Sequence, residues 1–405
     1  MDLSDINLLD LDRYAEGPPL DWFAYLRAHA PVYRHPDQTE RGFWALTKFD
    51  DIAKAAKTPT VFSSSYLRGG TIVLGHSGID TMMGTAPRVM SNMDAPEHLK
   101  YRRLSTRAFT NKALDALVPA YRRAAAALID NAMKRESVDF VTDIAAKLPV
   151  QAIGEMLGIP EEDRHLLGKW TDALTGSEDP ELSRSPEEVA EANTALFTYG
   201  QQLRERRAEE PGDDLLSALI AAEVDDEGLT EEELGGFFAL LVIAGAETSR
   251  NVLSHGLIGL LEDPDQYGML HEDPSLAKDA TEEILRWSPA VIYLGRHVTQ
   301  DIEFGGQQMK EGDRVALFFA SGNRDEDKFA DADRFDIHRR PREHLAFGSG
   351  PHACLGAHLA RIEIRVFYEE LAQRASKVRI TDKPSYLRSN LAGGVKHLPV
   401  ALTPA

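Results

Sequence analysis

Residues 347–356 read Phe-Gly-Ser-Gly-Pro-His-Ala-Cys-Leu-Gly and hold the chain's one cysteine, Cys354. Apolar residues at helical spacing follow, so this cysteine is predicted to lie at a helix start, where free backbone amides and the helix dipole stabilise a thiolate. The glycines let the backbone approach a large flat group closely. A lone cysteine is usually a small core residue. This setting instead indicates a thiolate that ligates haem iron.

The same stretch also fits a looser pattern, the G-x-G-x-x-A of dinucleotide-binding loops, with Glu370 about 20 residues after it. That fold needs a buried strand before the first glycine and further βαβ units after it. The preceding residues 339–343 are polar, and little chain follows Glu370. An iron-ligating thiolate is therefore the favoured interpretation, and a dinucleotide site is the alternative.

The longest predicted helix covers residues 230–262 and starts with a capping box, Thr230-Glu-Glu-Glu233. Its middle reads Ala244-Gly-Ala-Glu-Thr248. We expect the Thr248 hydroxyl to bond the Ala244 carbonyl and Gly245 to weaken the helix, so that one turn opens. Glu247 and Thr248 are polar residues within an apolar helix, so they either lie on a helix face exposed to solvent or form a functional pair.

Composition narrows the possible classes of protein. The 405 residues include 45 Lys plus Arg and 65 Asp plus Glu, and the formal net charge of −20 argues against nucleic acid or an anionic membrane as the main partner. One cysteine excludes an internal disulfide and a multi-thiolate metal site. No targeting segment is evident at residues 1–21, and the longest apolar run, 235–246, is too short for a bilayer. We expect a cytoplasmic protein without a membrane anchor.

The remaining patterns predict a mainly α chain with small β-sheets, organised as one domain over residues 1–405. Further helices are predicted over residues 121–133, 145–157, 187–206 and 214–222, and one follows Cys354. Strands are predicted over residues 31–34, 42–48, 297–304 and 314–319.

Three motifs together resemble the bacterial cytochrome P-450s, which are haem-thiolate monooxygenases. They are F-G-x-G-x-H-x-C-x-G, A-G-x-E-T and Glu283-Ile-Leu-Arg286, in the family's order over nearly the whole chain. The resemblance implies the P-450 fold, with the long helix crossing a haem b whose iron is ligated by Cys354. It also implies that haem contacts come from Ala244, Phe347, Gly348 and Gly356.

The resemblance further implies which charged residues serve the haem and the core. His98 and Arg102, one helical turn apart, would bind the propionates together with Arg296 and His352. Glu283 and Arg286 would form a buried structural pair with a third, basic partner. For that partner we expect Arg334, with Arg339 and His344 as alternatives.

The activity implied by the resemblance is insertion of one oxygen atom from O2 into a C–H bond of a hydrophobic substrate. Thr248 and Glu247 would be the catalytic pair that delivers protons. Electrons would come from NAD(P)H through a reductase and a separate ferredoxin, and the chain would be a monomer. The ferredoxin would dock on a basic patch made of Lys100, Arg102, Arg103, Arg107, Lys112 and Arg361.

Several stretches are similar to actinobacterial hydroxylases of steroid side chains and branched lipids. A terpenoid substrate, or a role as a tailoring hydroxylase or epoxidase of a polyketide or terpenoid, is an alternative. A haem-thiolate binder or peroxygenase is another, which the Glu247–Thr248 pair disfavours. The apolar, glycine-bearing segment 71–83 is predicted to cover the substrate pocket.

Overall fold

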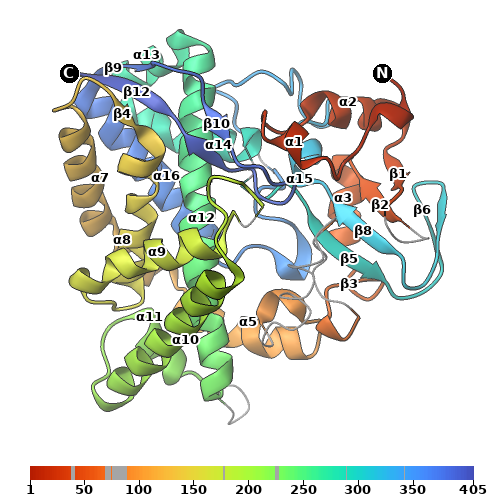
Figure 1. Cartoon of the computed structure of the whole chain (residues 1–405), viewed down its shortest axis with the longest axis horizontal. Helices are drawn as coiled ribbons and strands as arrows, with labels where there is room; N and C mark the ends of the chain where they lie inside the picture. Colours follow the sequence, from red (N-terminus) through yellow and green to blue (C-terminus); the bar gives the residue numbers. More distant parts are fainter. Residues whose placement is uncertain are drawn as a thin grey trace.

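The structure is a computed structural model that describes residues 1–37, 42–68, 74, 89–176, 178–223, 228–288, 290–341 and 343–405, without the side chains of Arg107, Ala108 and Pro264. The predicted cover segment 71–83 lies outside this range apart from Leu74. A half made mostly of helices lies beside a half that holds the N-terminal segment and the largest sheet (Figure 1).

Long helix α12, Glu231–Glu262, runs through the helical half from end to end (Figure 1). The predicted capping box is present, because Glu233 N donates to Thr230 Oγ1 (3.3 Å) and Thr230 N donates to Glu233 Oε2 (2.8 Å). The helix is continuous at Gly245, where we expected an opened turn. A Cβ at Gly245 would lie 2.6 Å from Ile153 Cδ1, so this glycine allows close packing between α8, Lys147–Met156, and α12.

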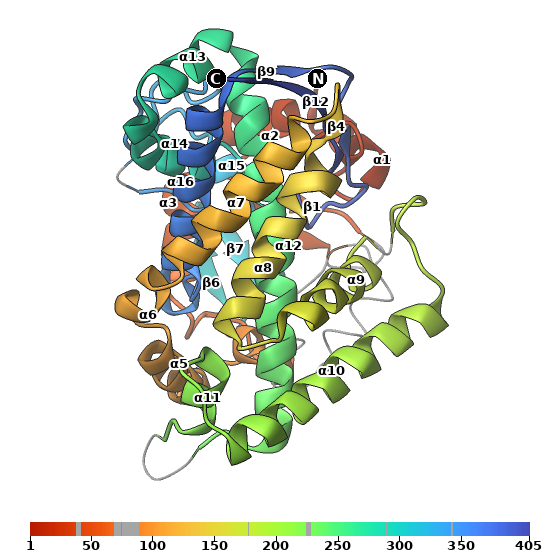
Figure 2. The same cartoon turned by 90° about the vertical axis from the view of Figure 1, so that its left-hand side faces the viewer.

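Several helices pack against α12 on the side seen in Figure 2. They are α8, α9 (Arg164–Leu174), α10 (Pro186–Glu209) and α16 (Ala357–Arg374), while α7 (Val118–Ala132) packs on α16 and α8. The other helices are α1 (Leu11–Tyr14), α2 (Leu20–His29), α3 (Phe49–Ala56), α5 (Glu97–Ala108), α6 (Asn111–Asp115), α11 (Leu215–Ile220), α13 (Pro264–Glu272), α14 (Ala277–Trp287) and α15 (Phe319–Gly322).

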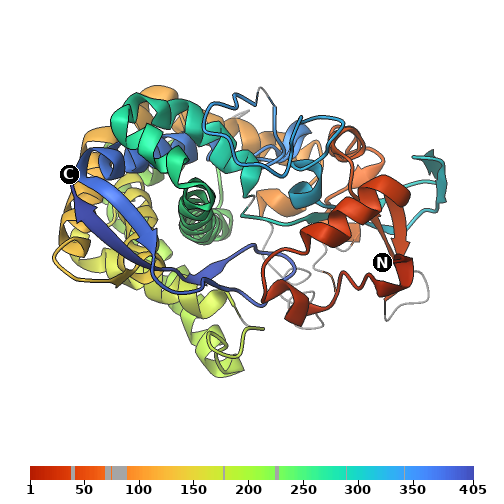
Figure 3. The ribbon, with the colours of Figure 1, turned by 90° about the horizontal axis from the view of Figure 1, so that it is seen from above.

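The largest sheet has the strand order β1-β2-β8-β5-β3. Its strands are β1 (Val32–His35), β2 (Phe43–Leu46), β3 (Phe62–Ser63), β5 (Leu294–Val298) and β8 (Arg314–Leu317). β2 and β8 are parallel, with Phe43 opposite Arg314, and the other pairs are antiparallel. Seen from above, α12 lies between this sheet and the outer helices (Figure 3).

The C-terminal residues form smaller sheets that the sequence patterns did not predict. They contain β4 (Val138–Asp139), β9 (Ala375–Ile380), β10 (Ser385–Tyr386), β11 (Val395–His397) and β12 (Pro399–Pro404), and a separate hairpin joins β6 (Ile302–Phe304) to β7 (Gln307–Met309). The predicted helices otherwise agree with the structure within a few residues, whereas the predicted strand 297–304 is divided between β5 and β6, and helices such as α2, α3, α9 and α13 were not predicted. No helix among the described residues is both long and apolar enough to cross a bilayer.

Candidate functional site

Cys354 lies in the turn before α16, after the short 3-10 helix Gly350–His352. Its backbone N–H donates to the Phe347 carbonyl (2.9 Å), which closes the loop. Gly350 requires a left-handed φ of +73°, and a Cβ there would lie 2.4 Å from the carbonyl oxygen of Ala56. Gly348 also has a positive φ, but the nearest atom to a Cβ at this position would be 3.9 Å away. Gly350 is therefore required for close packing as well as for its backbone conformation, whereas Gly348 is required only for its backbone conformation.

The Cys354 thiol is solvent-accessible, although protein surrounds most of it. Burial raises the pKa of this thiol, opposed by the Gly356 amide and by the positive charges of Arg102 and Arg361. The Gly356 amide at the helix start therefore favours the thiolate, in the predicted direction, but burial outweighs this effect in the protein alone. A metal ion would be needed to deprotonate the sulfur, as metals generally do with cysteine ligands.

The predicted propionate ligands converge in space. The rings of His98 and His352 lie 4.1 Å apart between centroids. Burial, followed by the charge of Arg296 and the neighbouring His98 and Arg102, lowers the pKa of His352 to about 3. Burial also lowers the pKa of Arg296 to about 10. Four basic side chains from three separate chain segments thus meet at one place.

This cluster fits an anionic group. His98 Nε2 is buried and has no hydrogen-bond partner in the described structure. The charge of the Asp94 carboxylate acts on both Arg296 and His98, but this carboxylate accepts hydrogen bonds from Ser63 and Ser64. Buried positive charge without a matched anion is costly. The residues present therefore fit an anionic group such as the two propionates of a haem.

On α12, the face that carries Ala244 and Thr248 is accessible. Ala244 is exposed in the middle of the helix, and Thr248 is half buried. The Thr248 hydroxyl donates to the Ala244 carbonyl (2.6 Å), as predicted. This bond uses the hydroxyl proton of Thr248, so the hydroxyl oxygen can still accept a hydrogen bond from another group.

Glu247 is buried and held on both of its oxygens. Asn251 Nδ2 donates to Glu247 Oε1 (3.0 Å), and Arg250 pairs with Oε2. Arg250 Nη1 also bonds Asp172 Oδ1 on α9 (3.0 Å), and the Asp172 side chain is 57% exposed. The sequence analysis missed Arg250, Asn251 and Asp172. The one sequence signal for the Glu247–Arg250 ion pair is that the two residues are three positions apart on a helix.

The Glu283–Arg286 pair is confirmed as fully buried, with both side chains 0% exposed and 2.7 Å between Arg286 Nε and Glu283 Oε2. Its third partner is Arg339, whose Nε donates to Glu283 Oε1 (3.1 Å). Our first choice, Arg334, is wrong: its side chain is exposed, and only its carbonyl takes part, as an acceptor from Arg286 (3.3 Å). His344 instead bonds Glu282 (3.1 Å).

Part of the predicted basic patch makes other contacts in the described structure. Arg361 is paired with Glu282 (2.6 Å) and lies over the Phe347 ring, and Arg102 belongs to the basic cluster. Arg103 and Lys112 are exposed. The side chain of Arg107 lies outside the described residues.

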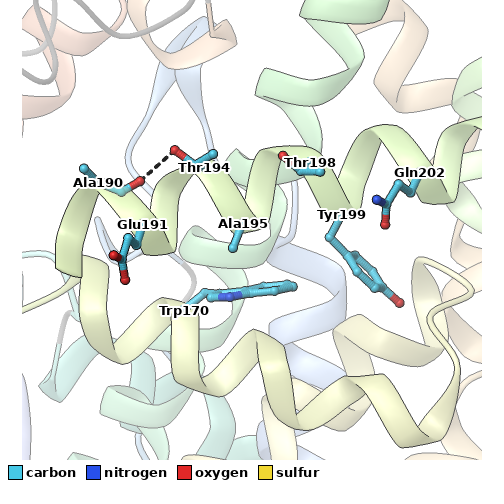
Figure 4. A pocket seen from close by; sticks show the side chains of 8 residues that line it. All are labelled: Trp170, Ala190, Glu191, Thr194, Ala195, Thr198, Tyr199 and Gln202. Atoms are coloured by element: carbon cyan, nitrogen blue, oxygen red, sulfur yellow. Dashed lines mark hydrogen bonds between the residues drawn. The ribbon is translucent and has the colours of Figure 1, made fainter. Parts of the chain in front are cut away.

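Two cavities in the described structure lie away from these residues. A groove of about 590 Å³ between α9 and α10 is lined by Trp170, Ala195 and Tyr199 among others (Figure 4). A second cavity, of about 390 Å³, lies beside His255 and Arg324. Neither is lined by the cysteine, the basic cluster or the Ala244–Thr248 turn.

The dinucleotide alternative also fails, since the described residues from 323 to 347 contain no strand.

Comparison with known proteins identifies the family. Residues 184–384 match the family model "Cytochrome P450". Linalool 8-monooxygenase of Pseudomonas putida is 36% identical over 98% of this chain and 99% of its own length. The chain belongs to the cytochrome P450 family. It is a P450 monooxygenase, and membership implies a haem-iron cofactor and O2 as co-substrate.

Other P450s are similarly close. The methyl-branched lipid omega-hydroxylase of Mycobacterium tuberculosis is 39% identical, over 98% of this chain and 95% of its own length. The steroid C26-monooxygenase of Rhodococcus jostii is 36% identical, over 96% of this chain and 83% of its own length. Among solved structures, a Mycobacterium marinum P450 in complex with pseudoionone has a TM-score of 0.87 and 34% identity, covering 94% of each chain. The predicted fold and the predicted likeness to lipid and steroid hydroxylases are confirmed.

Proposed function

We propose that this P450 hydroxylates a methyl-branched hydrophobic molecule near the end of its chain, using electrons from a ferredoxin. The substrate class is supported by the relatives, because an omega position and a steroid C26 position both lie at the end of a chain. The single observation that carries the site assignment is the convergence of His98, Arg102, Arg296 and His352 near Cys354.

In this proposal Cys354 ligates the iron, and the four basic residues bind the propionates. Ala244, Phe347, Gly348 and Gly356 contact the haem. The bound haem supplies reductive activation of O2 and insertion of one oxygen atom into a C–H bond, and the second oxygen leaves as water. The residues of this chain bind that cofactor, orient the substrate and control protons.

Thr248 and Glu247 are the proposed proton-delivery pair. With its own proton donated to the Ala244 carbonyl, the Thr248 oxygen accepts hydrogen bonds on the accessible face of α12. Glu247 pairs with Arg250, which also bonds the largely exposed carboxylate of Asp172. Arginine stays protonated in proteins and therefore does not relay protons. We assign Arg250 the task of holding the Glu247 carboxylate in place.

The ferredoxin is proposed to dock on the α5–α6 surface, where Arg103 and Lys112 are exposed on an otherwise acidic protein. Charge complementarity of this kind acts mainly on the association rate. Charge reversal at both positions should slow reduction by a ferredoxin most at low ionic strength. Reduction by dithionite should stay unchanged.

The first experiment is the absorption spectrum of the reduced, carbon-monoxide-bound protein, with Cys354→His as the matched variant. The wild type should give the red-shifted Soret band of thiolate ligation, and the variant should lose it. The ferric protein is then titrated with cholestenone, a methyl-branched fatty acid and a monoterpene alcohol. The ligand that drives the iron to high spin identifies the class. If none of the three does so, the substrate proposal fails.

A further inference from the structure

The residue after Thr248 forms a bond that the proposed function does not use. Ser249 Oγ donates to Glu363 Oε2, with 2.5 Å between the two oxygens. Both residues are buried, at 7% and 2% exposure. Ser249 lies on α12 and Glu363 on α16, the helix that follows Cys354. The bond therefore joins the helix that carries the proton-delivery pair to the helix that starts at the proposed iron ligand.

Glu363 has no cationic partner in the described structure. Ser249 is the one hydrogen-bond partner that the described residues give it, while Glu369 and Glu370, further along α16, pair with Arg122. Burial raises the pKa of Glu363 to about 8, and the Ser249 bond opposes this only in part. The carboxyl group is therefore mostly protonated at neutral pH.

A second polar group faces the same place. The Tyr121 hydroxyl, on α7, is buried without a hydrogen-bond partner among the described residues, and the charge of Glu363 raises the Tyr121 pKa further. The groups that face Glu363 from neighbouring elements are thus Ser249 and Tyr121, and neither carries a charge at neutral pH. An apolar side chain would be cheaper here. Perturbed, unpaired acids of this kind are concentrated at functional positions.

We propose that Glu363 is a positioning residue for Thr248, which its neutral carboxyl group holds in place through Ser249, and that ionisation of Glu363 releases this hold. This inference rests on the proposed role of Thr248. The physical reason is that an ionised carboxylate without a cation must recruit water or move, because burial of an isolated charge is costly. Either response disturbs Ser249 and the α12 turn next to it.

The test uses the haem-loaded full chain and two observables that need no turnover. The first is the infrared carbonyl band of a protonated carboxylic acid, followed with pH. The second is the hydrogen-exchange protection of backbone amides 244–249, expressed relative to unstructured rates so that base catalysis cancels. The wild type should lose one carboxyl band with a midpoint near pH 8, and protection of this turn should fall about fivefold over the same range.

Three variants separate positioning from a purely structural role. Glu363→Gln keeps a group that can accept the Ser249 bond but cannot ionise, so it should keep protection and lose the pH response. Glu363→Leu should resemble the wild type at high pH throughout. Tyr368→Phe is the control, because it removes another buried α16-to-α12 bond, from Tyr368 to the Leu253 carbonyl (2.7 Å), without touching Ser249. It should keep the pH response.

The proposal is overturned if Glu363→Gln retains the wild-type pH response, or if Tyr368→Phe abolishes it as well. With the substrate found by titration, product formed per NADH should fall above about pH 8 in the wild type and stay level in Glu363→Gln. Failure of the proposed function has a different signature. Thr248→Ala would then leave product per NADH unchanged, while the Glu363 band would still titrate.

Discussion

Arg339 Nε donates to Glu283 Oε1 across 3.1 Å, from a loop more than fifty residues further along the chain. The carboxylate also receives two bonds from Arg286, at 2.7 and 2.8 Å, and one from the backbone N–H of Asp336, at 3.0 Å. Because Glu283 is fully buried, these partners must compensate for its lost hydration. Arg339 therefore fixes the loop that leads to the cysteine segment against α14.

Loss of Arg339 should destabilise the protein. In Arg339→Leu the buried carboxylate keeps Arg286 but loses one of its two cations, and we expect a cost of about 2 kcal/mol. The melting temperature followed by circular dichroism gives the change. Arg334→Ala is the matched control, because the exposed Arg334 contributes only its backbone carbonyl. Equal melting temperatures for the two variants would contradict the assignment.

Removal of the Thr248 hydroxyl should uncouple turnover. We expect Thr248→Ala to consume NADH while product per NADH falls by about tenfold or more, because positioned proton-transfer groups typically contribute about a hundredfold or more. Thr281→Ala removes a hydroxyl that also bonds a carbonyl one turn back, from Thr281 to Ala277 (2.7 Å), but on α14. Coupling in that variant should match the wild type. Product and NADH are measured in the same reaction.

Arg296 should have opposite effects on the haem-free and haem-loaded protein. Burial lowers its pKa to about 10, so the charged side chain is retained at neutral pH at a cost in folding free energy. Arg296→Gln should therefore raise the melting temperature of the haem-free chain. In the loaded protein the same change removes a propionate partner, and haem transfer to apomyoglobin should become faster. A variant that loses stability in both forms would argue against an anion at this cluster.

Two glycines beside the cysteine should differ in their tolerance of alanine. At Gly350 the new Cβ would lie 2.4 Å from a backbone oxygen, so the loop must shift, and haem content after expression should fall sharply. At Gly348 the nearest atom is 3.9 Å away, so only the left-handed φ of +66° is strained, at about 1 kcal/mol. Gly348→Ala should therefore keep most of its haem. The ratio of Soret to protein absorbance measures both.

His397 should contribute stability that disappears in alkaline solution. It lies between Glu181 (Nε2 to Oε1, 2.6 Å) and Asp139 (Nδ1 to Oδ2, 2.5 Å), and these bonds, with Glu181 first, raise its pKa. A histidine whose pKa is raised by folding contributes its full stability at pH values below its pKa in the unfolded chain, which is about 6.5. This contribution is lost as the pH rises through its pKa in the folded protein.

The His397 side chain is 42% exposed, so we expect the contribution to stay below about 1 kcal/mol. The melting-temperature difference between the wild type and His397→Gln should shrink from about pH 6 to about pH 9, and high salt should reduce it at the lower pH. A difference that grows with pH would contradict this sign.

Sequence alone determined the parts of this protein that depend on local chemistry. The capping box at Thr230, the Thr248-to-Ala244 bond and the length of α12 follow from spacing along one helix, so they were predicted correctly. The glycines and cysteine of residues 347–356 are consecutive in the chain, and their pattern identified the family that the comparisons confirm.

Tertiary structure decided every relationship that joins distant segments. Arg334 and Arg339 are equally basic and lie in one loop, and only the path of that loop places Arg339 against Glu283. Asp172, on a helix that the sequence analysis missed, reaches Arg250 because α9 packs across α12. The Ser249–Glu363 bond and the raised thiol pKa of Cys354 likewise depend on packing. Burial and long-range charge come from the folded arrangement, and no local pattern encodes them.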